Sequence, residues 1–357
     1  MSQYTLYGLV MAGGQGTRFW PESTSKKPKQ YLSLVSEKSL LHASLSRFGD
    51  LIGTDKRYIV TVKMQESLAK ECSEGEINPK NFIFEPAGRN TAPCILLALA
   101  SLVAEGARDE DVVSIVTSDH VIKNTSGFQK TIEKASAAAR SEGKIVTIGI
   151  TPESPHTGFG YIKAGDGNTD GVFEVNQFVE KPDKVTAETY LADGNYFWNA
   201  GMFVSTIGTL KEEFNGHAPE MFTHFNSLVS AHGNDQRIAE VYDQIPAESI
   251  DYAVMEKSNK VMVVPAEFDW NDIGSWDALE SVLPSEDGNT WVADNGHFQL
   301  DASGNIAFAP GMHVSLIGVE DLIVVSNGKS VVVLPKSRSQ DIKKIVAQLK
   351  EQNSDLV

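Results

Sequence analysis

The sequence has few cysteines, no long apolar run and no excess of basic residues, and each absence excludes a class of protein. Its two cysteines, Cys72 and Cys94, are too few for a disulfide framework. Neither belongs to a CxxC pair or has a histidine at metal-ligand spacing. We therefore interpret both as buried thiols of a protein that works in a reducing cytoplasm.

No apolar run approaches the roughly 18 residues that a membrane-spanning helix needs. The amino-terminal segment MSQYTLYGLVMAGG lacks the basic start and the long apolar middle of a secretory signal. Hydrophobic residues make up 41% of the chain, which is enough for a well-buried core. We expect a soluble globular protein with no membrane partner.

Acidic residues outnumber basic ones, with 47 Asp and Glu against 31 Lys and Arg, so the formal net charge is -16. Such a protein repels a nucleic-acid backbone, and the sequence offers no basic face that would overcome this repulsion. We expect no nucleic-acid partner. A local basic pocket in an acidic protein can still bind a small polyanion.

Strand-like and helix-like segments alternate in the first 150 residues, which predicts βαβ crossovers and a mainly parallel sheet. In such sheets, ligands bind at the loops that leave the carboxyl ends of the strands. The expected strands, rich in β-branched residues, are 6–11, 57–62, 82–85, 112–117 and 144–150. The expected helices, with apolar residues at helical spacing, are 39–48, 64–74, 90–105 and 126–141.

The alternation weakens after residue 150, where we expect an extension that carries the second half of a binding cleft. It includes a strand at 172–179 and a short helix near 187–191. Short β-type runs broken by glycines fill residues 291–334, and an amphipathic helix follows at 339–350. The predicted domains are therefore a large α/β domain, 1–283, and a small β-rich domain, 284–357.

The glycine-rich loop after the first strand is the first candidate for a binding site. Gly13, Gly14 and Gly16 would let backbone N–H groups surround a phosphate. The loop is not a Walker A sequence, because no Gly-Lys-Ser/Thr follows it. It is not a dinucleotide fingerprint either, because Phe19 stands where GxGxxG requires its third glycine.

Basic residues follow this loop closely. Arg18 comes two positions after the last glycine, and Lys26, Lys27 and Lys29 come within the next eleven, opposed only by Glu22. Arginine can bind two phosphate oxygens at once, and lysine supplies a mobile point charge. A reacting triphosphate suits such a set. A solvated surface loop is the better interpretation for Lys26 or Lys27, and a worse one for Arg18 and Lys29.

Several motifs along the chain resemble those of sugar-1-phosphate nucleotidylyltransferases, and the Trp-Pro form of the first resembles the mannose-1-phosphate guanylyltransferases among them. The resemblance covers nearly the whole chain. It rests on GGQGTRFWP at 13–21, KPKQYL at 27–32, EPAGRNTAP at 85–93, SDH at 118–120, FVEKP at 178–182, WNAGMF at 198–203, SIDYAVMEK at 249–257 and DIGSW at 272–276.

Two departures from the family pattern limit the resemblance. The family usually continues Trp-Pro with Leu-Ser-Arg, whereas this chain has Glu22, Ser23 and Thr24. Longer relatives carry a cupin-type isomerase domain after the transferase, and this sequence ends where that domain would begin. No isomerase activity is expected.

The resemblance implies a Rossmann-like nucleotidyltransferase domain that transfers GMP from GTP to α-D-mannose 1-phosphate, giving GDP-mannose and pyrophosphate. Such a transfer depends on positioning and electrostatic stabilisation and needs no nucleophilic side chain. The family implies that Arg18 and Lys29 act on the triphosphate and the α-phosphate. The implied GTP-binding residues are Gly13, Gly14, Gly16, Thr17, Arg18, Lys29, Glu85, Gly88, Asn90 and Thr91.

Two carboxylates are candidate ligands for a metal ion. Asp119 ends an apolar strand and Asp272 follows Trp270 and Asn271 in another loop. From position alone, a helix cap is the better interpretation of such a carboxylate, ahead of a metal ligand. The resemblance favours a Mg²⁺ site between Asp119 and Asp272, with His120 as a structural neighbour, because Mg²⁺ prefers oxygen ligands.

The resemblance also divides the remaining motifs between the base and the sugar. The carboxylate of Glu85 could accept hydrogen bonds from both donors on one edge of guanine; alternatively, Asn90 caps the following helix and Glu85 is solvated. The implied sugar-phosphate residues are Gly158, Glu180, Lys181, Asn199 and Gly201. Alternatively, Glu180 and Lys181 form an ordinary surface pair.

Other functions remain open from the residues alone. The same chemistry could act on another sugar 1-phosphate or nucleoside triphosphate, since few hydroxyl contacts separate epimers. A non-catalytic regulatory subunit that binds a nucleotide sugar is disfavoured, because Arg18, Lys29, Asp119 and Asp272 are all present. A nicotinamide-dependent oxidoreductase is disfavoured by Phe19. The family's small domain resembles a left-handed β-helix that often takes part in association, so we expect a homodimer, although 291–334 shows no clear hexapeptide repeat.

Overall fold

The computed structural model describes residues 4–14, 16–168 and 170–357. Packing contacts divide the chain into two compact units. Unit 1 comprises Met1–Gly13, Ser44–Ser118 and Ile122–Asp269, and unit 2 comprises Gly14–Ala43, Asp119–Val121 and Trp270–Val357. The predicted domains, 1–283 and 284–357, stay a prediction about domain organisation; the packing units group the glycine-rich loop with the C-terminal residues.

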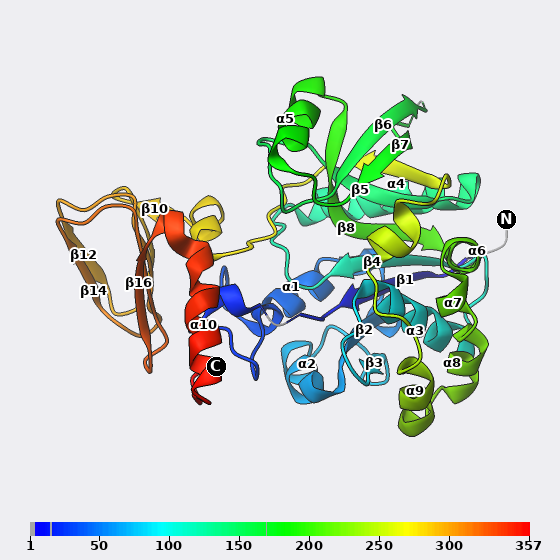
Figure 1. Cartoon of the computed structure of the whole chain (residues 1–357), viewed down its shortest axis with the longest axis horizontal. Helices are drawn as coiled ribbons and strands as arrows, with labels where there is room; N and C mark the ends of the chain where they lie inside the picture. The colour runs from blue at the N-terminus through cyan, green and yellow to red at the C-terminus, as the bar shows by residue number, and fades with distance from the viewer. Residues whose placement is uncertain (1–3, 15, 169) are drawn as a thin grey trace. The chain divides into compact units, whose positions relative to one another are not determined.

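Unit 1 is built on a nine-stranded mixed sheet with the order β3-β2-β1-β4-β8-β5-β9-β7-β6 (Figure 1). Parallel pairing joins β3, β2, β1 and β4, and also joins β5 to β9. The long strand β8 runs antiparallel between β4 and β5. The strands are β1 (Leu6–Met11), β2 (Arg57–Val62), β3 (Phe82–Glu85), β4 (Val112–Thr117), β5 (Ile145–Ile150), β6 (Tyr161–Gly167), β7 (Phe173–Val179), β8 (Tyr196–Thr206) and β9 (Val261–Pro265).

The mixed sheet confirms the expected fold class, with a difference in its second half. The crossovers predicted from the alternation produce the parallel half. The strands after residue 150 pair mainly antiparallel, because β6 and β7 form a hairpin-like pair and β8 reverses direction between two parallel segments. Antiparallel strands need no helical crossover, which explains why the alternation weakens there.

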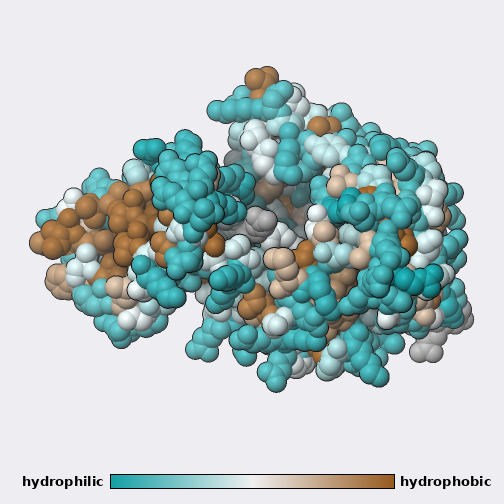
Figure 2. Space-filling view, turned by 60° about the horizontal axis from the view of Figure 1, so that its bottom comes forward, coloured by the Kyte–Doolittle hydropathy of each residue, from teal (hydrophilic) through white to brown (hydrophobic). Residues whose placement is uncertain are grey.

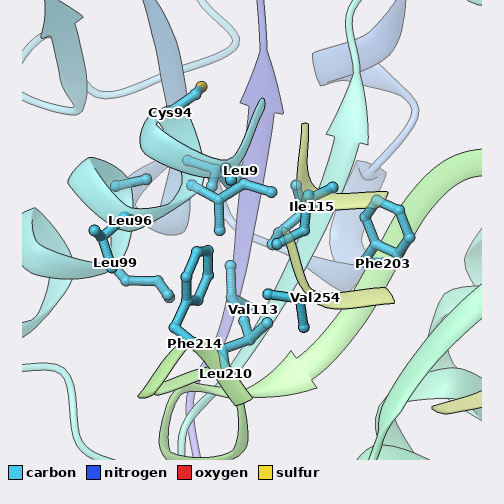
Figure 3. Packing of buried hydrophobic residues seen from close by; sticks show 14 of the residues in the cluster. Leu9, Cys94, Leu96, Leu99, Val113, Ile115, Phe203, Leu210, Phe214 and Val254 are labelled. Atoms are coloured by element: carbon cyan, nitrogen blue, oxygen red, sulfur yellow. The ribbon is translucent and has the colours of Figure 1, made fainter. Parts of the chain in front are cut away.

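Helices cover the sheet of unit 1, and α3 (Thr91–Ala104) contributes most to its core. Asn90 caps α3, since its side-chain oxygen accepts a hydrogen bond from the Thr91 N–H at 2.9 Å. Nearly every residue of α3 is buried, and Leu96 and Leu99 pack with Leu9 of β1 (Figure 3). Among the described residues, no helix combines the length and apolar character needed to cross a bilayer.

The remaining helices are shorter or more polar than α3. Asn124 and Asp183 cap α4 and α5 through side-chain oxygens, as local sequence chemistry predicts. The helices are α1 (Leu40–Ser46), α2 (Glu66–Cys72), α4 (Thr125–Glu142), α5 (Lys184–Asp193), α6 (Ile207–His217), α7 (Pro219–Phe222), α8 (Phe225–Ala231), α9 (Asp235–Tyr242) and α10 (Ile342–Glu351).

Unit 2 contains the β-rich C-terminal segment. One sheet has the order β10-β11-β13-β15-β16, and β12 pairs with β14 in a second. Pairing is parallel between β11, β13 and β15 and between β12 and β14, which is the ladder pattern of a β-helix. The strands are β10 (Ser285–Glu286), β11 (Asn289–Val292), β12 (His297–Leu300), β13 (Ile306–Phe308), β14 (Val314–Ile317), β15 (Leu322–Ser326) and β16 (Val331–Pro335).

One hydrophobic core joins the segments of unit 2. Trp276 is fully buried, and its ring lies 5.0 Å, centroid to centroid, from both Phe19 and Phe308. Its indole N–H donates to the Trp20 carbonyl at 3.1 Å. Ile342 of α10 is buried in the same cluster. The residues after the glycine-rich loop are therefore held by the C-terminal segment.

We predict that Trp276→Ala lowers the free energy of unfolding by about 3–5 kcal/mol, because it removes a large buried ring and leaves a cavity. Val333→Ala is the matched control, since Val333 is an exposed apolar residue of the same unit and should change stability by less than about 0.5 kcal/mol. Urea unfolding measures both values. Equal stability of the two variants would contradict the central role of Trp276 in this core.

Candidate active site

A cavity of about 340 Å³ in unit 2 brings Arg18 and Lys29 of the first motif together with charged residues of later segments, whereas Lys26 and Lys27 do not line it. The structure brings together the predicted catalytic residues Arg18, Lys29, Asp119 and Asp272 in its wall. Their roles in catalysis stay predictions. The complete lining is Gly16, Thr17, Arg18, Phe19, Lys29, Asp119, His120, Asp272, Gly274 and Lys343.

The glycine-rich loop approaches Lys29 so closely that a side chain would not fit at Gly16. This residue has a left-handed backbone (φ +55°), and a Cβ built on it would lie 2.4 Å from the Cβ of Lys29. The hydroxyl of Ser23 donates to the Gly16 carbonyl at 2.6 Å and fixes the turn. Gly13 and Gly14 are exposed, with open space where a Cβ would point. Gln15, whose N–H is part of the predicted phosphate-binding loop, lies outside the described residues.

Lys29 lies in the 3-10 turn Lys29–Tyr31 and is only 7% exposed. Its ammonium donates to the Asp119 carboxylate at 3.0 Å and to the Asp272 carbonyl at 2.6 Å. Burial acts to raise the pKa of Asp119, but the positive charge of Lys29 and the influence of His120 outweigh it and hold that pKa below its ordinary value. Asp119 is therefore a carboxylate at neutral pH.

Arg18 presents hydrogen-bond donors that the protein leaves unused. Its buried Nε has no partner among the described residues. One terminal nitrogen lies 3.5 Å from the Gly274 carbonyl, which is the outer limit for a hydrogen bond. A buried donor of this kind is costly unless it is satisfied. A phosphate oxygen would satisfy it, since guanidinium groups bind phosphate with two parallel hydrogen bonds.

The donor set of this cavity fits the implied magnesium ion. Asp119 and Asp272 both place carboxylates on its wall, and a Mg²⁺ ion in proteins takes one or two carboxylates together with water and substrate phosphates. Within the part of the chain that the structure describes, there is no cluster of three or more His, Cys, Asp or Glu suited to a metal. His120 accepts a hydrogen bond from the Trp270 indole at 3.1 Å, which agrees with its interpretation as a structural neighbour.

The residues implied in base recognition lie in unit 1, and they differ in exposure. Glu85 is 4% exposed, and Tyr242 donates to its carboxylate at 2.5 Å. Burial raises the pKa of Glu85, an effect that the hydrogen bonds from Tyr242 and Cys94 oppose. Gly88 and Asn90 are exposed, whereas Thr91 accepts a hydrogen bond from the Ile250 N–H. Binding guanine through both Glu85 oxygens requires the Tyr242 hydrogen bond to be shared or broken.

Of the residues implied in sugar-phosphate binding, Glu180, Lys181, Asn199 and Gly201 take part in a polar network in unit 1. Glu180 and Lys181 are paired, and the Lys181 side chain is 59% exposed. A Cβ at Gly160 would lie 2.5 Å from the Glu180 carboxylate, so that glycine is needed there. The oxygen of the Asn199 side chain accepts a hydrogen bond from the Gly201 N–H at 3.0 Å.

Gly158 is not connected to this network by any contact among the described residues. Its N–H donates to the His156 ring at 3.1 Å in an exposed loop. Gly201 has φ +66°, a conformation that favours glycine, and it lies inside β8 where the register against β5 shifts.

Asp251 is a member of this network that sequence reasoning did not assign to the site. The Asn199 amide donates to its carboxylate at 3.1 Å. Burial, together with the negative charge of Glu180, raises the pKa of Asp251 to about 6. The available signal was an aspartate inside the apolar run SIDYAVMEK, but its proximity to Asn199 and Glu180 depends on the fold.

Comparisons with known proteins extend these observations. A family model described as nucleotidyl transferase matches residues 7–286, and a model described as a MannoseP isomerase/GMP-like beta-helix domain matches residues 295–349. The chain is 37% identical to a protein of Vibrio cholerae serotype O1 named putative mannose-1-phosphate guanylyltransferase, over 97% of this chain and 74% of that one. It is 36% identical to the mannose-1-phosphate guanylyltransferase of Escherichia coli K12, over 98% and 74%.

A solved structure is similar over nearly its entire length. The Thermus thermophilus protein named mannose-1-phosphate geranyltransferase superposes with a TM-score of 0.89 at 33% identity, over 97% of this chain and 99% of that one. The likeness therefore includes both the large sheet and the β-rich segment.

Asp251 predicts a pH-dependent effect on stability. Because its pKa is higher in the folded protein than in an unfolded chain, its contribution to stability is complete below pH 4 and is lost as the pH rises through about 6. Asp251→Asn removes this loss and should stabilise the protein at pH 8 by on the order of 2 kcal/mol, with little change at pH 4.

Urea unfolding of the wild type and of Asp251→Asn at both pH values measures the effect. Asp183→Asn is a control of opposite sign, because hydrogen bonds from the Thr186 backbone and side chain lower the pKa of Asp183. The contribution of the ionised Asp183 to stability is lost only as the pH falls below about 4, so its substitution should cost stability at pH 8 and nearly as much at pH 4. A difference between Asp251→Asn and wild type that is the same at pH 4 and pH 8 would show that Asp251 titrates normally.

Proposed function

The chain belongs to the nucleotidyl transferase family, and on that premise we propose that it transfers GMP from GTP to α-D-mannose 1-phosphate, giving GDP-mannose and pyrophosphate. The cavity in unit 2 carries this proposal, because Arg18, Lys29, Asp119 and Asp272 line it together. The names of relatives that align over 97% of the chain support the choice of guanine and mannose.

In this reaction, an oxygen of the sugar phosphate attacks the α-phosphorus of GTP and pyrophosphate leaves in line. Negative charge accumulates on the phosphate oxygens in the transition state, and preorganised cations lower its energy. The ammonium of Lys29 is fixed by Asp119 and by the Asp272 carbonyl, so it reaches the transition state without reorganising. Arg18 contributes its unused Nε donor to the same oxygens.

Asp119 and Asp272 would hold the magnesium ion, which when bound would neutralise phosphate charge and assist the leaving group. In unit 1, the hydrogen bonds of Asn199 to Gly201 and Asp251 would orient its amide toward sugar hydroxyls. Lys181 would bind the sugar phosphate, since its ammonium is exposed while Glu180 is held inside. Glu85, Gly88, Asn90 and Thr91 would form the guanine site.

Three finer proposals accompany the reaction. GTP and mannose 1-phosphate are the substrates. The protein works in the cytoplasm, where GTP is available and where Cys72 and Cys94 remain free thiols, as they are here. It forms a homodimer through the apolar face that β12 and β14 expose, which includes Phe298 (64% exposed), Leu300 (53%) and Ile317 (66%). Figure 2 shows brown, hydrophobic atoms gathered over the β-rich part.

We expect Mg²⁺-dependent release of pyrophosphate from GTP in the presence of mannose 1-phosphate, and not with ATP, UTP, dTTP or glucose 1-phosphate. Asp272→Ala should lower kcat by roughly two orders of magnitude or more. Asp277→Ala is the matched control, because Asp277 binds Ser275 nearby and does not line the cavity.

Turnover with a different base or sugar would preserve the chemistry and refute the substrate pair. Specific binding of GDP-mannose without turnover on any pair would favour a regulatory subunit. The coupled pyrophosphate assay separates these results when it is paired with equilibrium binding of GDP-mannose.

For the homodimer, the wild type should sediment at twice the chain mass of 38.8 kDa. The double variant Phe298→Asp, Ile317→Lys should sediment as a monomer, because charges cannot be buried in an apolar interface without large cost. Val185→Asp is the control, because Val185 is an exposed apolar residue of α5 in unit 1 and is not part of β12 or β14. A monomeric wild type at micromolar concentration would refute the dimer.

A further inference from the structure

The C-terminal helix α10 contributes a basic residue to the cavity that the transferase motifs do not include. Lys343, in the first turn of α10, lines the cavity beside Arg18, Lys29 and the two aspartates. The helix packs against the turn Thr17–Phe19 that carries Arg18. All these residues belong to unit 2. The inference below rests on the proposed function and adds to it.

The side of α10 that faces the loop is defined by helical spacing. Ile342 and Val346 are buried in the core of unit 2 and fix the rotation of the helix. Lys343, Val346 and Lys350 are separated by three and four positions, so they form one stripe along the helix. Val346 and Lys350 line a small hollow together with Thr17, and Thr17 also lines the main cavity. The stripe therefore faces the segment that begins at Thr17.

Lys343 has no ion-pair partner among the described residues, whereas the adjacent Lys344 and the cavity residue Lys29 both form ion pairs. Lys344 pairs with Asp341 at 2.7 Å. Lys29 is buried and pairs with Asp119. Lys343 is exposed although it lines the same cavity, which places its ammonium toward solvent. Its charge is available to a ligand.

We propose that Lys343 binds the pyrophosphate portion of GTP. In the transfer, a bond forms between the sugar-phosphate oxygen and the α-phosphorus while the bond from that phosphorus to the bridging oxygen of pyrophosphate breaks. The electron pair of the broken bond stays on pyrophosphate, so negative charge grows on the group that must depart toward solvent. Lys343 donates hydrogen bonds to that group and exchanges no proton with it.

This assignment gives α10 a direct part in substrate binding. A flexible four-carbon side chain at the solvent side of the cavity can follow the pyrophosphate as it leaves, whereas buried Lys29 cannot. The selective consequence is kinetic: removing the Lys343 charge weakens GTP and pyrophosphate binding and leaves the two sugar-containing ligands unaffected.

The test is Lys343→Gln, assayed in both directions. We expect KM for GTP in the forward reaction and KM for pyrophosphate in the reverse reaction to rise about 10-fold, as expected for loss of one charge-assisted hydrogen bond. KM for mannose 1-phosphate and for GDP-mannose should stay at the wild-type values. Lys343→Arg should recover most of the loss. Lys344→Gln, which removes the adjacent paired lysine, is the matched control and should behave as wild type.

Calorimetric binding of magnesium pyrophosphate to the same variants gives a readout that does not depend on turnover. Weaker binding by Lys343→Gln than by Lys344→Gln supports the proposal even if the wild type fails to act on GTP and mannose 1-phosphate, a result that would refute the proposed function alone. Wild-type KM and pyrophosphate affinity in Lys343→Gln would overturn the proposal. An equal rise in KM for all four ligands would also overturn it, because it would indicate general damage.

Discussion

The ammonium of Lys29 is the interaction on which the candidate active site depends. It joins three segments that are distant in sequence: the turn that contains Lys29, the segment after β4 at Asp119, and the loop at Asp272. A buried ammonium must be satisfied by charge or by hydrogen bonds, and here both a carboxylate and a carbonyl do so. The same contact that stabilises the buried charge fixes the wall of the candidate cavity.

The packing of unit 2 reinforces this arrangement. The Gly16 backbone contacts Lys29 at a distance that only glycine allows, and Trp276 packs against Phe19 on the other side of the loop. A site that must hold three cations near two carboxylates requires a rigid frame, since small shifts would leave charges unpaired. The β-rich segment supplies that frame through Phe308 and Ile342.

Local patterns predicted much of the fold. Strands expected at 6–11, 57–62, 82–85 and 112–117 have these bounds in the structure, and α3 begins after its predicted cap, Asn90. Hydrophobic periodicity and capping are local, so sequence reveals them. The antiparallel insertion of β8 is decided by pairing across the sheet, which leaves no local signal.

The same limit applies to the site. The motifs predicted the set around Arg18 and Lys29, but Asp251 became visible only through its contact with Asn199. In sequence, Lys343 and Lys344 are indistinguishable members of one helix, and the rotation of α10 alone separates them. The resemblance offered no substitute, because neither residue had a role in the motifs as they were interpreted.

The long separation between Phe19 and Trp276 has a consequence for biosynthesis. Residues 14–43 leave the ribosome early, but the core that holds them, with Trp276, Phe308 and Ile342, is translated much later. At roughly 5–20 residues per second, the nascent chain carries its glycine-rich loop without packing partners for tens of seconds. The large sheet of unit 1 has all its strands by residue 265, so it can form while the loop still lacks its partners. The cavity lined by Arg18 and Lys29 can thus be completed only after residue 342 has been translated, when the large sheet already has all its strands.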